Sequence, residues 1–417
     1  DSAFVGNMRV GSEAALNALT LVFPVQMLMV AVSIGTGVGV NALVSKCLGM
    51  GEKEKAGKAA GNAVFLGIVI SLMFIIFGLF GTNIYISSQT SDPLISEMAN
   101  EYLGICCVFS FGIIFFSVFE KLLQAGGHSG FSTIAQIIGA VANIILDPIL
   151  IYGLLGFPEM GVKGAALATI ISQGVSCLWV LKFLTGKKTV LKIRLKNLVL
   201  DGKIVTSVLS LGVSPFIMQA TECLIQLTFN NGMLKYGNDL YVALMSILFS
   251  LTQLIWMPLN GFSQGAQPVI GYNYGAKRFD RVKKAFKLQF TVSICFSLFA
   301  VALVEVFPTA FLKMFTNDQE LIDIGINSTR LFLAGMSVMG AQCACQQTFL
   351  ALGEAKISMF LACLRKIILL FPLALILPNI ANMGVWGLLL AEPVSDVVAA
   401  SCTTIMFTIR SKKILKQ

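Results

Sequence analysis

The chain has 417 residues, of which 56% are hydrophobic and 12% are charged, and its mean hydropathy is +0.83. Soluble domains carry about a quarter charged residues, and disordered chains are rich in charge and Pro, so this composition excludes both classes. The apolar residues extend over the whole length, which also excludes a soluble domain with a single anchor. The composition therefore predicts an integral membrane protein.

Long uncharged segments follow one another along the chain. A helix needs about 20 mostly apolar residues to cross a bilayer. Each uncharged segment is read as one helix core, and the predicted fold is therefore an all-α polytopic membrane protein. The eleven complete spans that we predict are residues 14–44, 56–86, 98–123, 129–153, 164–185, 204–234, 239–271, 281–306, 321–350, 356–378 and 383–410.

Alternating these spans across a bilayer places most Lys and Arg residues on one side. By the positive-inside rule that side is cytoplasmic, and the protein is expected in the cell inner (plasma) membrane. The net charge of +9 then reflects topology and anionic lipid, not nucleic acid. The predicted cytoplasmic segments are 46–58, 121–128, 182–203, 277–287, 354–356 and the C-terminus, and only Arg9, Lys163, Lys235, Lys313 and Arg330 fall on the other side.

The sequence contains an internal repeat. Residues 37–51 align with 261–275, and 144–148 align with 368–372 at the same offset; residues 161–168 align with 384–391 at an offset one residue shorter. The second copy holds six spans and the first holds five, so we expect the first helix to be mostly missing, with residues 1–6 as its outer end.

An even number of spans gives both copies the same orientation, which makes them parallel repeats about an axis along the membrane normal. We therefore expect two six-helix lobes around a central cleft. Residues 1–185 form the N-lobe, 186–203 a cytoplasmic linker and 204–417 the C-lobe.

Acidic residues inside the spans are the candidate functional groups, because a charge at the bilayer centre costs at least about 2.5–3.5 kcal/mol. Asn143 and Asp147 share a helical face, and Pro148 removes a backbone donor and is expected to kink the helix. A carboxylate, an amide oxygen and freed carbonyls suit Na⁺, and the carboxylate could instead carry H⁺. An interhelical hydrogen bond is the alternative role for Asp147.

Three more carboxylates lie in the second half. Glu392 and Asp396 share one face, followed by Pro393, and predict cation binding with a shared proton; an ion pair of Asp396 with Arg365 or Lys366 is the alternative. Glu222 predicts a contact with a cationic substrate or a proton. Its alternative is a hydrogen bond to Gln219 or Gln226.

The repeat distributes these groups unevenly. Thr169 aligns with Glu392, and Asp147 aligns with Phe371. The divergence suggests separate tasks for the two lobes, such as ion coupling in one and substrate binding in the other. The ten Cys and one His lack zinc-ligand spacing, so no cofactor is expected beyond a coupling ion.

Several motifs in order resemble the MATE (multidrug and toxic compound extrusion) transporters, and most closely their bacterial DNA-damage-inducible (DinF-like) branch. They are residues 1–6 (DSAFVG), Gly49-Met-Gly51, Asn143 with Asp147-Pro148, 164–169 (GAALAT) and 265–275 (GAQPVIGYNYG). The resemblance covers the whole chain. It implies a V-shaped antiporter that exports organic cations and drugs in exchange for Na⁺ or H⁺.

The resemblance also implies roles for single residues. Asp1, Asn143, Asp147 and Thr169 match the family's cation-coupling site, where Asp147 and Asn143 are the ligands for a possible Na⁺. Glu222 matches the family's seventh-helix Glu. The sodium-coupled branch carries an Asp on its tenth helix, and residues 331–350 contain none, so the coupling ion stays open between Na⁺ and H⁺.

Two other classes of membrane protein fit the sequence less well. A lipid-linked oligosaccharide flippase would present basic residues to its cleft for a pyrophosphate, and only Arg365 and Lys366 lie within spans. An intramembrane aspartyl protease would need a GxGD motif, which is missing. The sequence therefore predicts a multidrug efflux antiporter and no enzyme, a monomer whose partners are small organic cations and the lipid bilayer.

Overall fold

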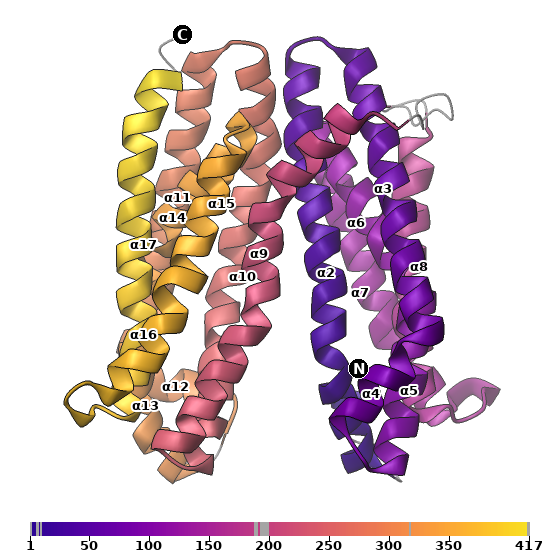
Figure 1. Ribbon diagram of the computed structural model, residues 1–417, viewed down its shortest axis with the longest axis vertical. Helices are drawn as coiled ribbons and strands as arrows, with labels where there is room; N and C mark the ends of the chain where they lie inside the picture. The colour runs from indigo at the N-terminus through magenta and orange to yellow at the C-terminus, as the bar shows by residue number, and fades with distance from the viewer. Residues whose placement is uncertain are drawn as a thin grey trace. The chain divides into compact units, whose positions relative to one another are not determined.

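A computed structural model describes residues 2–5, 8, 11–186, 191, 200–316 and 318–414. These residues are almost entirely helical and include no strand, which confirms the all-α fold. Among them, nine helices are long and apolar enough to cross a membrane, and a bent helix pair raises the number to ten. The chain is a multi-pass membrane protein (Figure 1).

The helices belong to two compact units. Unit 1 comprises Asp1–Leu48 and Glu52–Gly212, and unit 2 comprises Gly49–Gly51 and Val213–Gln417. The helices of unit 1 are α1 (Ser2–Val5), α2 (Ser12–Gly49), α3 (Lys53–Phe80), α4 (Thr82–Gln89), α5 (Pro93–Val108), α6 (Phe111–Ala125), α7 (Ser129–Tyr152), η1 (Leu154–Gly156) and α8 (Gly161–Leu184).

The long helix α9 (Gly202–Tyr236) begins in unit 1 and continues into unit 2. The other helices of unit 2 are α10 (Asp239–Gly275), α11 (Phe279–Val306), α12 (Pro308–Leu312), α13 (Gln319–Leu333), α14 (Met336–Leu352), α15 (Ala355–Cys363), the π-helical segment η3 (Leu364–Leu370), α16 (Phe371–Ile376), η4 (Leu377–Asn382) and α17 (Val385–Ile414).

The first turns of α9 pack into unit 1 because glycines let two backbones meet. A Cβ added at Gly39 of α2 would collide with the carbonyl oxygen of Val208, and one added at Gly212 would collide with that of Gly35. The second unit therefore begins at Val213, whereas the sequence places the start of the C-lobe at residue 204. The predicted linker, 186–203, lies mostly outside the described residues.

Two predicted spans are broken in the structure. Residues 98–123 correspond to α5 and α6, which are bent by 43°. Residues 321–350 correspond to two helices, because α13 ends at Leu333 and α14 begins at Met336. Neither helix is among the candidate spans. With 15 and 17 residues, each is shorter than the roughly 20 residues that a bilayer needs, and α13 also carries charged residues.

The two units repeat the same order of elements. The long helix α2 is followed by α3 in unit 1, as α10 is followed by α11 in unit 2, where α9 comes before them; the last helices are α8 and α17. In unit 1, α6 packs against α3 and α8; in unit 2, α14 packs against α11 and α17. In this order α7 corresponds to the α15–η3–α16 segment, which supports the duplication found in the sequence.

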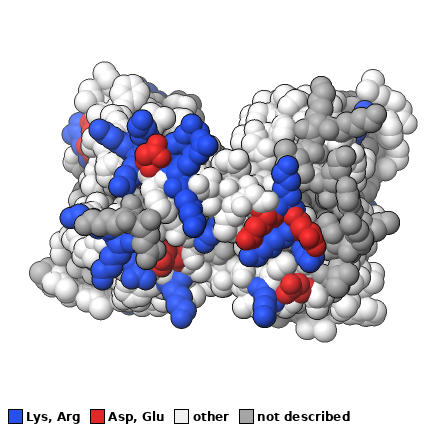
Figure 2. All heavy atoms as spheres, turned by 90° about the horizontal axis from the view of Figure 1, so that it is seen from above, with Lys and Arg blue, Asp and Glu red and all other residues white. Residues whose placement is uncertain are grey.

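Basic side chains gather at one end of unit 2, where the α10–α11 turn and the end of α17 lie (Figure 2). Arg410 lies 3.8 Å from Glu354, so the α14–α15 turn belongs to the same end. In unit 1 the α2–α3 turn carries the exposed ion pairs Lys55–Glu52 and Lys58–Glu54.

Candidate functional site

Asp147 lies in the interior of unit 1 and is 1% exposed. The Asn143 side chain, one turn earlier on α7, donates from Nδ2 to Asp147 Oδ1 at 3.3 Å. The sequence predicted this pair from the spacing alone. Helix α7 continues through Pro148 to Tyr152, and because Pro148 has no N–H, the Ile144 carbonyl lacks its usual helical donor.

Other helices bring neutral polar groups to Asp147. The hydroxyl of Tyr102 on α5 is hydrogen-bonded to Thr169 of α8 and interacts electrostatically with Asp147. Gln26 of α2 donates to the Tyr102 hydroxyl at 3.2 Å. Four helices thus converge on one buried carboxylate. We call the set of Gln26, Tyr102, Asn143, Asp147 and Thr169 the Asp147 group.

The structure therefore brings Asn143, Asp147 and Thr169 together, and Asp1 lies outside the described residues. Sequence reasoning missed Gln26 and Tyr102. The sequence did contain a signal for Gln26, because it is a large polar residue within a mostly apolar span. Within the described parts of the chain, no three His, Cys, Asp or Glu side chains are grouped to hold a metal ion.

A second buried polar group of unit 1 was also missed. Glu120, 5% exposed, accepts through Oε1 from Gln124 at 2.8 Å, from Gln136 at 2.8 Å and from Ser132 at 3.1 Å. Lys121 is 4% exposed and its Nζ lies 3.9 Å from the same oxygen. The sequence placed Lys121 in a cytoplasmic turn; the structure places it in α6, which continues to Ala125 and buries the side chain.

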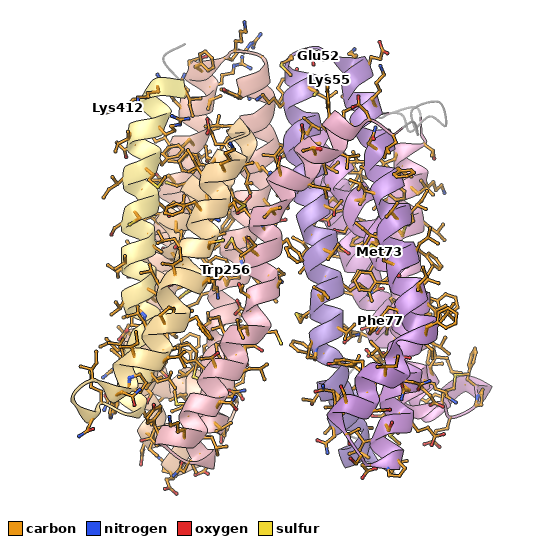
Figure 3. All side chains as sticks on the ribbon, in the orientation of Figure 1. Glu52, Lys55, Met73, Phe77, Trp256 and Lys412 are labelled. Atoms are coloured by element: carbon orange, nitrogen blue, oxygen red, sulfur yellow. The ribbon has the colours of Figure 1, made fainter. Side chains whose placement is uncertain are left out.

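Unit 2 contains a cluster of five charged side chains. Arg365, in η3, donates from Nε to Asp396 Oδ1 at 2.8 Å and from Nη2 to Glu392 Oε1 at 3.2 Å. Its guanidinium also lies over the ring of Trp256, 5.6 Å from the centroid, near the middle of α10 (Figure 3). The cation–π contact and both ion pairs fix the guanidinium inside the unit.

The neighbouring Lys366 donates to Glu222 Oε2 at 2.7 Å. Glu222 therefore forms an ion pair across helices, and the hydrogen bond to Gln219 or Gln226 that the sequence offered as an alternative is not what the structure shows. The side chains of Arg365, Lys366, Glu392 and Asp396 are at most 6% exposed, whereas that of Glu222 is 24% exposed. We call Glu222, Arg365, Lys366, Glu392 and Asp396 the charge cluster.

Glu392 and Asp396 each keep one oxygen without a partner. Oε2 of Glu392 and Oδ2 of Asp396 are buried and accept no hydrogen bond within the described part of the chain. The sequence predicted that these two residues share a face and a proton, and it offered the ion pair of Asp396 with Arg365 as the alternative. In the structure the ion pair exists, and it occupies only one oxygen of each carboxyl group.

The two sites occupy equivalent places in the two units. The Asp147 group has its main residues on α7 and α8; the charge cluster has four of its five on η3 and α17, the corresponding segments of unit 2. Thr169 and Glu392 align in the repeat. The duplication thus placed polar side chains twice at one position of the fold, and the chemistry then diverged.

Comparisons with known proteins agree with this architecture. The MatE family model matches residues 1–149 and 215–376. The multidrug export protein MepA of Staphylococcus saprophyticus is 23% identical over 402 residues, 95% of this chain and 86% of that protein; MepA of Staphylococcus aureus strain MSSA476 is 24% identical over 403 residues, 95% and 86% of the two proteins.

Among solved structures, an outward-facing multidrug resistance MATE family transporter of the MOP superfamily matches with a TM-score of 0.92 and 24% identity, over 100% of this chain and 91% of that chain. This likeness shows a common fold. The family consists of transporters, which confirms that the chain is a transporter and no enzyme, while the DinF-like branch stays a prediction. Because the family model covers well over half of the residues, the chain belongs to the MatE family of membrane transporters.

Proposed function

We propose that this transporter exports small organic cations by exchanging them for an inorganic cation, Na⁺ or H⁺. The observation that carries the proposal is Asp147, a carboxylate at 1% exposure within a spanning helix that accepts a hydrogen bond from Asn143. Taking an ionised carboxylate out of water costs much free energy, and acidic side chains within membrane spans commonly mark ion pathways, so Asp147 is a place where a cation or a proton can bind. The names of the staphylococcal relatives, which are multidrug export proteins, support the same function.

A single carboxylate, Asp147, can link ion binding to the conformation of the transporter. Binding of a monovalent cation or a proton removes the negative charge of Asp147, and release of this ion restores a charge that is more stable where water can reach it. Asn143 would contribute its amide oxygen to a Na⁺, together with the Ile144 carbonyl. Ion binding and release at Asp147 can therefore bias two conformations of a carrier.

The orientation in the membrane is also part of the proposal. The basic segments 46–58, 182–203 and 277–287 and the C-terminus lie in the cytoplasm of a cell with this protein in its plasma membrane. The exposed basic end of unit 2 supports this (Figure 2). The proposal takes the monomer as the working unit.

A flippase for lipid-linked sugars is less well supported. Its pyrophosphate would need free cationic side chains, and the two intramembrane cations of unit 2 are both engaged by carboxylates, Arg365 by Glu392 and Asp396, and Lys366 by Glu222. The charge cluster contains more carboxylates than cations, so it favours a cationic ligand over an anionic one.

Replacing Asp147 by Asn tests the proposal. Cells that express the Asp147→Asn protein should retain ethidium like cells without the transporter, at equal amounts of protein in the membrane. Asp92→Asn is the matched control, because Asp92 is exposed and its side chain accepts from the first N–H groups of α5, a role that Asn also performs. Normal efflux by Asp147→Asn would contradict the proposal.

A further inference from the structure

The charges in the charge cluster of unit 2 do not cancel. It contains three carboxyl groups and two cationic side chains, so the fully ionised cluster carries one uncompensated negative charge. Four of the five side chains are at most 6% exposed. An uncompensated charge in such a place is expensive, so the cluster in its resting state needs one more positive charge.

The place for this charge is between Glu392 and Asp396. These residues are one turn apart on α17, both bind Arg365 through one oxygen, and their second oxygens are buried without a partner in the described structure. The charged groups that act on Glu392 are Asp396, Lys366, Arg365 and Glu222, and from α14 the thiol of Cys343 lies near Arg365. A proton held by the two free oxygens neutralises the cluster and needs no water.

Glu222 is the most exposed side chain of the charge cluster, so we expect an external cation to reach the cluster there. Its side chain is 24% exposed, and Gln219 and Gln226 lie on the same face of α9. Polar stripes on spanning helices face a polar space and not lipid, so the approach to Glu222 is polar. The Lys366 ammonium covers this carboxylate, and Trp256, whose ring faces Arg365, offers an aromatic surface to a cation.

We propose that Lys366 is a built-in counter-cation of Glu222: a monovalent organic cation displaces its ammonium, which moves to the free oxygens of Glu392 and Asp396 and expels the proton held there. This inference rests on the proposed function and deepens it, because it names a proton as an exchanged ion and places the cationic substrate at Glu222.

The exchange keeps the cluster neutral at both ends. Before it, the ammonium neutralises Glu222 and the proton neutralises the Glu392–Asp396 pair. After it, the organic cation neutralises Glu222, the ammonium takes the place of the proton, and one proton has left. Proton and organic cation therefore exclude one another, in a ratio of one to one, without any free charge in the interior.

The π-helical segment makes the movement local. Lys366 follows Arg365 directly, Arg365 is bound to both Glu392 and Asp396, and the charge of Lys366 already acts on Glu392. π-Helical turns are rare and occur often at functional sites. Arg365 itself stays in place, because two carboxylates and Trp256 hold it.

The test measures ethidium binding and proton release together, on the full chain purified in detergent. Ethidium fluorescence gives the affinity, and a pH dye in weak buffer counts protons. We expect one proton released per ethidium bound and an affinity that rises about tenfold per pH unit while the proton is bound. Glu392→Gln should release no proton and show an affinity that is weaker and independent of pH.

Lys366→Met removes the competitor, so ethidium should bind at least tenfold more tightly, and without proton release from Glu392. Lys163→Met is the matched control, since Lys163 is an exposed lysine paired with Glu101 in unit 1; it should behave as wild type. The double variant Lys366→Met/Glu222→Gln removes a cation and an anion together and should fold normally and lose ethidium binding.

The outcomes separate this inference from the proposed function. Binding without proton release by the wild type, or Lys366→Met with unchanged or weaker affinity, overturns the role of Lys366 while ethidium export through Asp147 can still hold. If the wild type binds no ethidium, both fall. If export depends on Asp147 and proton release depends on Glu392 and Lys366, both stand.

Discussion

Gly335 packs directly against Asp396. A Cβ added at Gly335 would lie 3.0 Å from Asp396 Oδ2 and 2.6 Å from the Cα of Pro393. The break between α13 and α14 thus falls where the chain passes the carboxyl group that Arg365 binds. A glycine here lets α17 bring Glu392 and Asp396 close to η3, so the fold and the charge cluster depend on one missing methyl group.

Gly335→Ala should therefore displace α17. Because the obstacle includes backbone, the added carbon cannot be accommodated by a rotamer change, and overpacking of this kind costs about 1–3 kcal/mol. We expect a lower Tm in detergent together with a weakened Arg365–Asp396 pair, measured by thermal unfolding and by ethidium-linked proton release. Gly261→Ala in α10, where an added Cβ meets nothing within 4 Å, should leave both unchanged.

Arg365→Met should destabilise unit 2 by more than the smaller side-chain volume of Met would explain. The change takes the guanidinium away from the buried Glu392 and Asp396, and breaking a buried ion pair from one side costs about 3–5 kcal/mol. Thermal unfolding of the purified protein measures the effect.

The triple variant Arg365→Met/Glu392→Gln/Asp396→Asn removes the charges together and should recover most of the lost stability. It should not recover proton release. If the single variant were as stable as the wild type, the ion pairs would not hold η3 to α17.

Glu120→Ala tests the polar group that sequence reasoning missed. Ser132 and Gln136 lose the carboxylate to which they donate, Gln124 keeps only its hydrogen bond to Ser132, and Lys121 loses the nearby carboxylate. A buried donor without a partner costs about 1–3 kcal/mol, so the Tm should fall clearly. Glu120→Gln keeps an acceptor oxygen and should lower the Tm less than Glu120→Ala. Glu101→Ala, which removes a partner of the exposed Lys163, is the control with no expected change.

Tyr102→Phe isolates the hydroxyl that links α2, α5 and α8. The ring stays buried, while Gln26 and Thr169 lose a shared partner beside Asp147. We expect ethidium efflux to fall about tenfold at unchanged expression, because orientation of the Asp147 group is lost and not its charge. Efflux equal to that of the wild type would show that the hydroxyl does not position the site.

Much of the fold could be predicted from sequence because hydropathy fixes where a helix may cross a bilayer. The predicted span 129–153 and helix α7 agree closely, and the Asn143–Asp147 contact follows from helical spacing. The spans at 98–123 and 321–350 were drawn as single helices, since hydropathy averages over a window and does not record a bend at Phe109 or a break at Gly335.

Partners between helices could not be predicted in the same way. The sequence offered Arg365 or Lys366 as a partner for Asp396 without choosing between them, and nothing in the order of residues says that Lys366 reaches Glu222 across 144 positions. Lys121 was assigned to a turn because a charge usually ends a span. In the structure its neighbour Glu120 provides a counter-charge, which lowers the free-energy cost of burying the lysine. The π-helical segment contains both Arg365 and Lys366. We recognised no sequence signal for it.

The most direct test of the central claim, exchange of an organic cation for an inorganic one through buried carboxylates, uses purified wild-type protein in proteoliposomes with Na⁺ and H⁺ gradients imposed separately. We predict that ethidium is driven across the membrane when a proton gradient is imposed, that it is not concentrated without an ion gradient, and that Asp147→Asn abolishes the movement. Equal ethidium movement with and without ion gradients, or full activity of Asp147→Asn, would contradict the account.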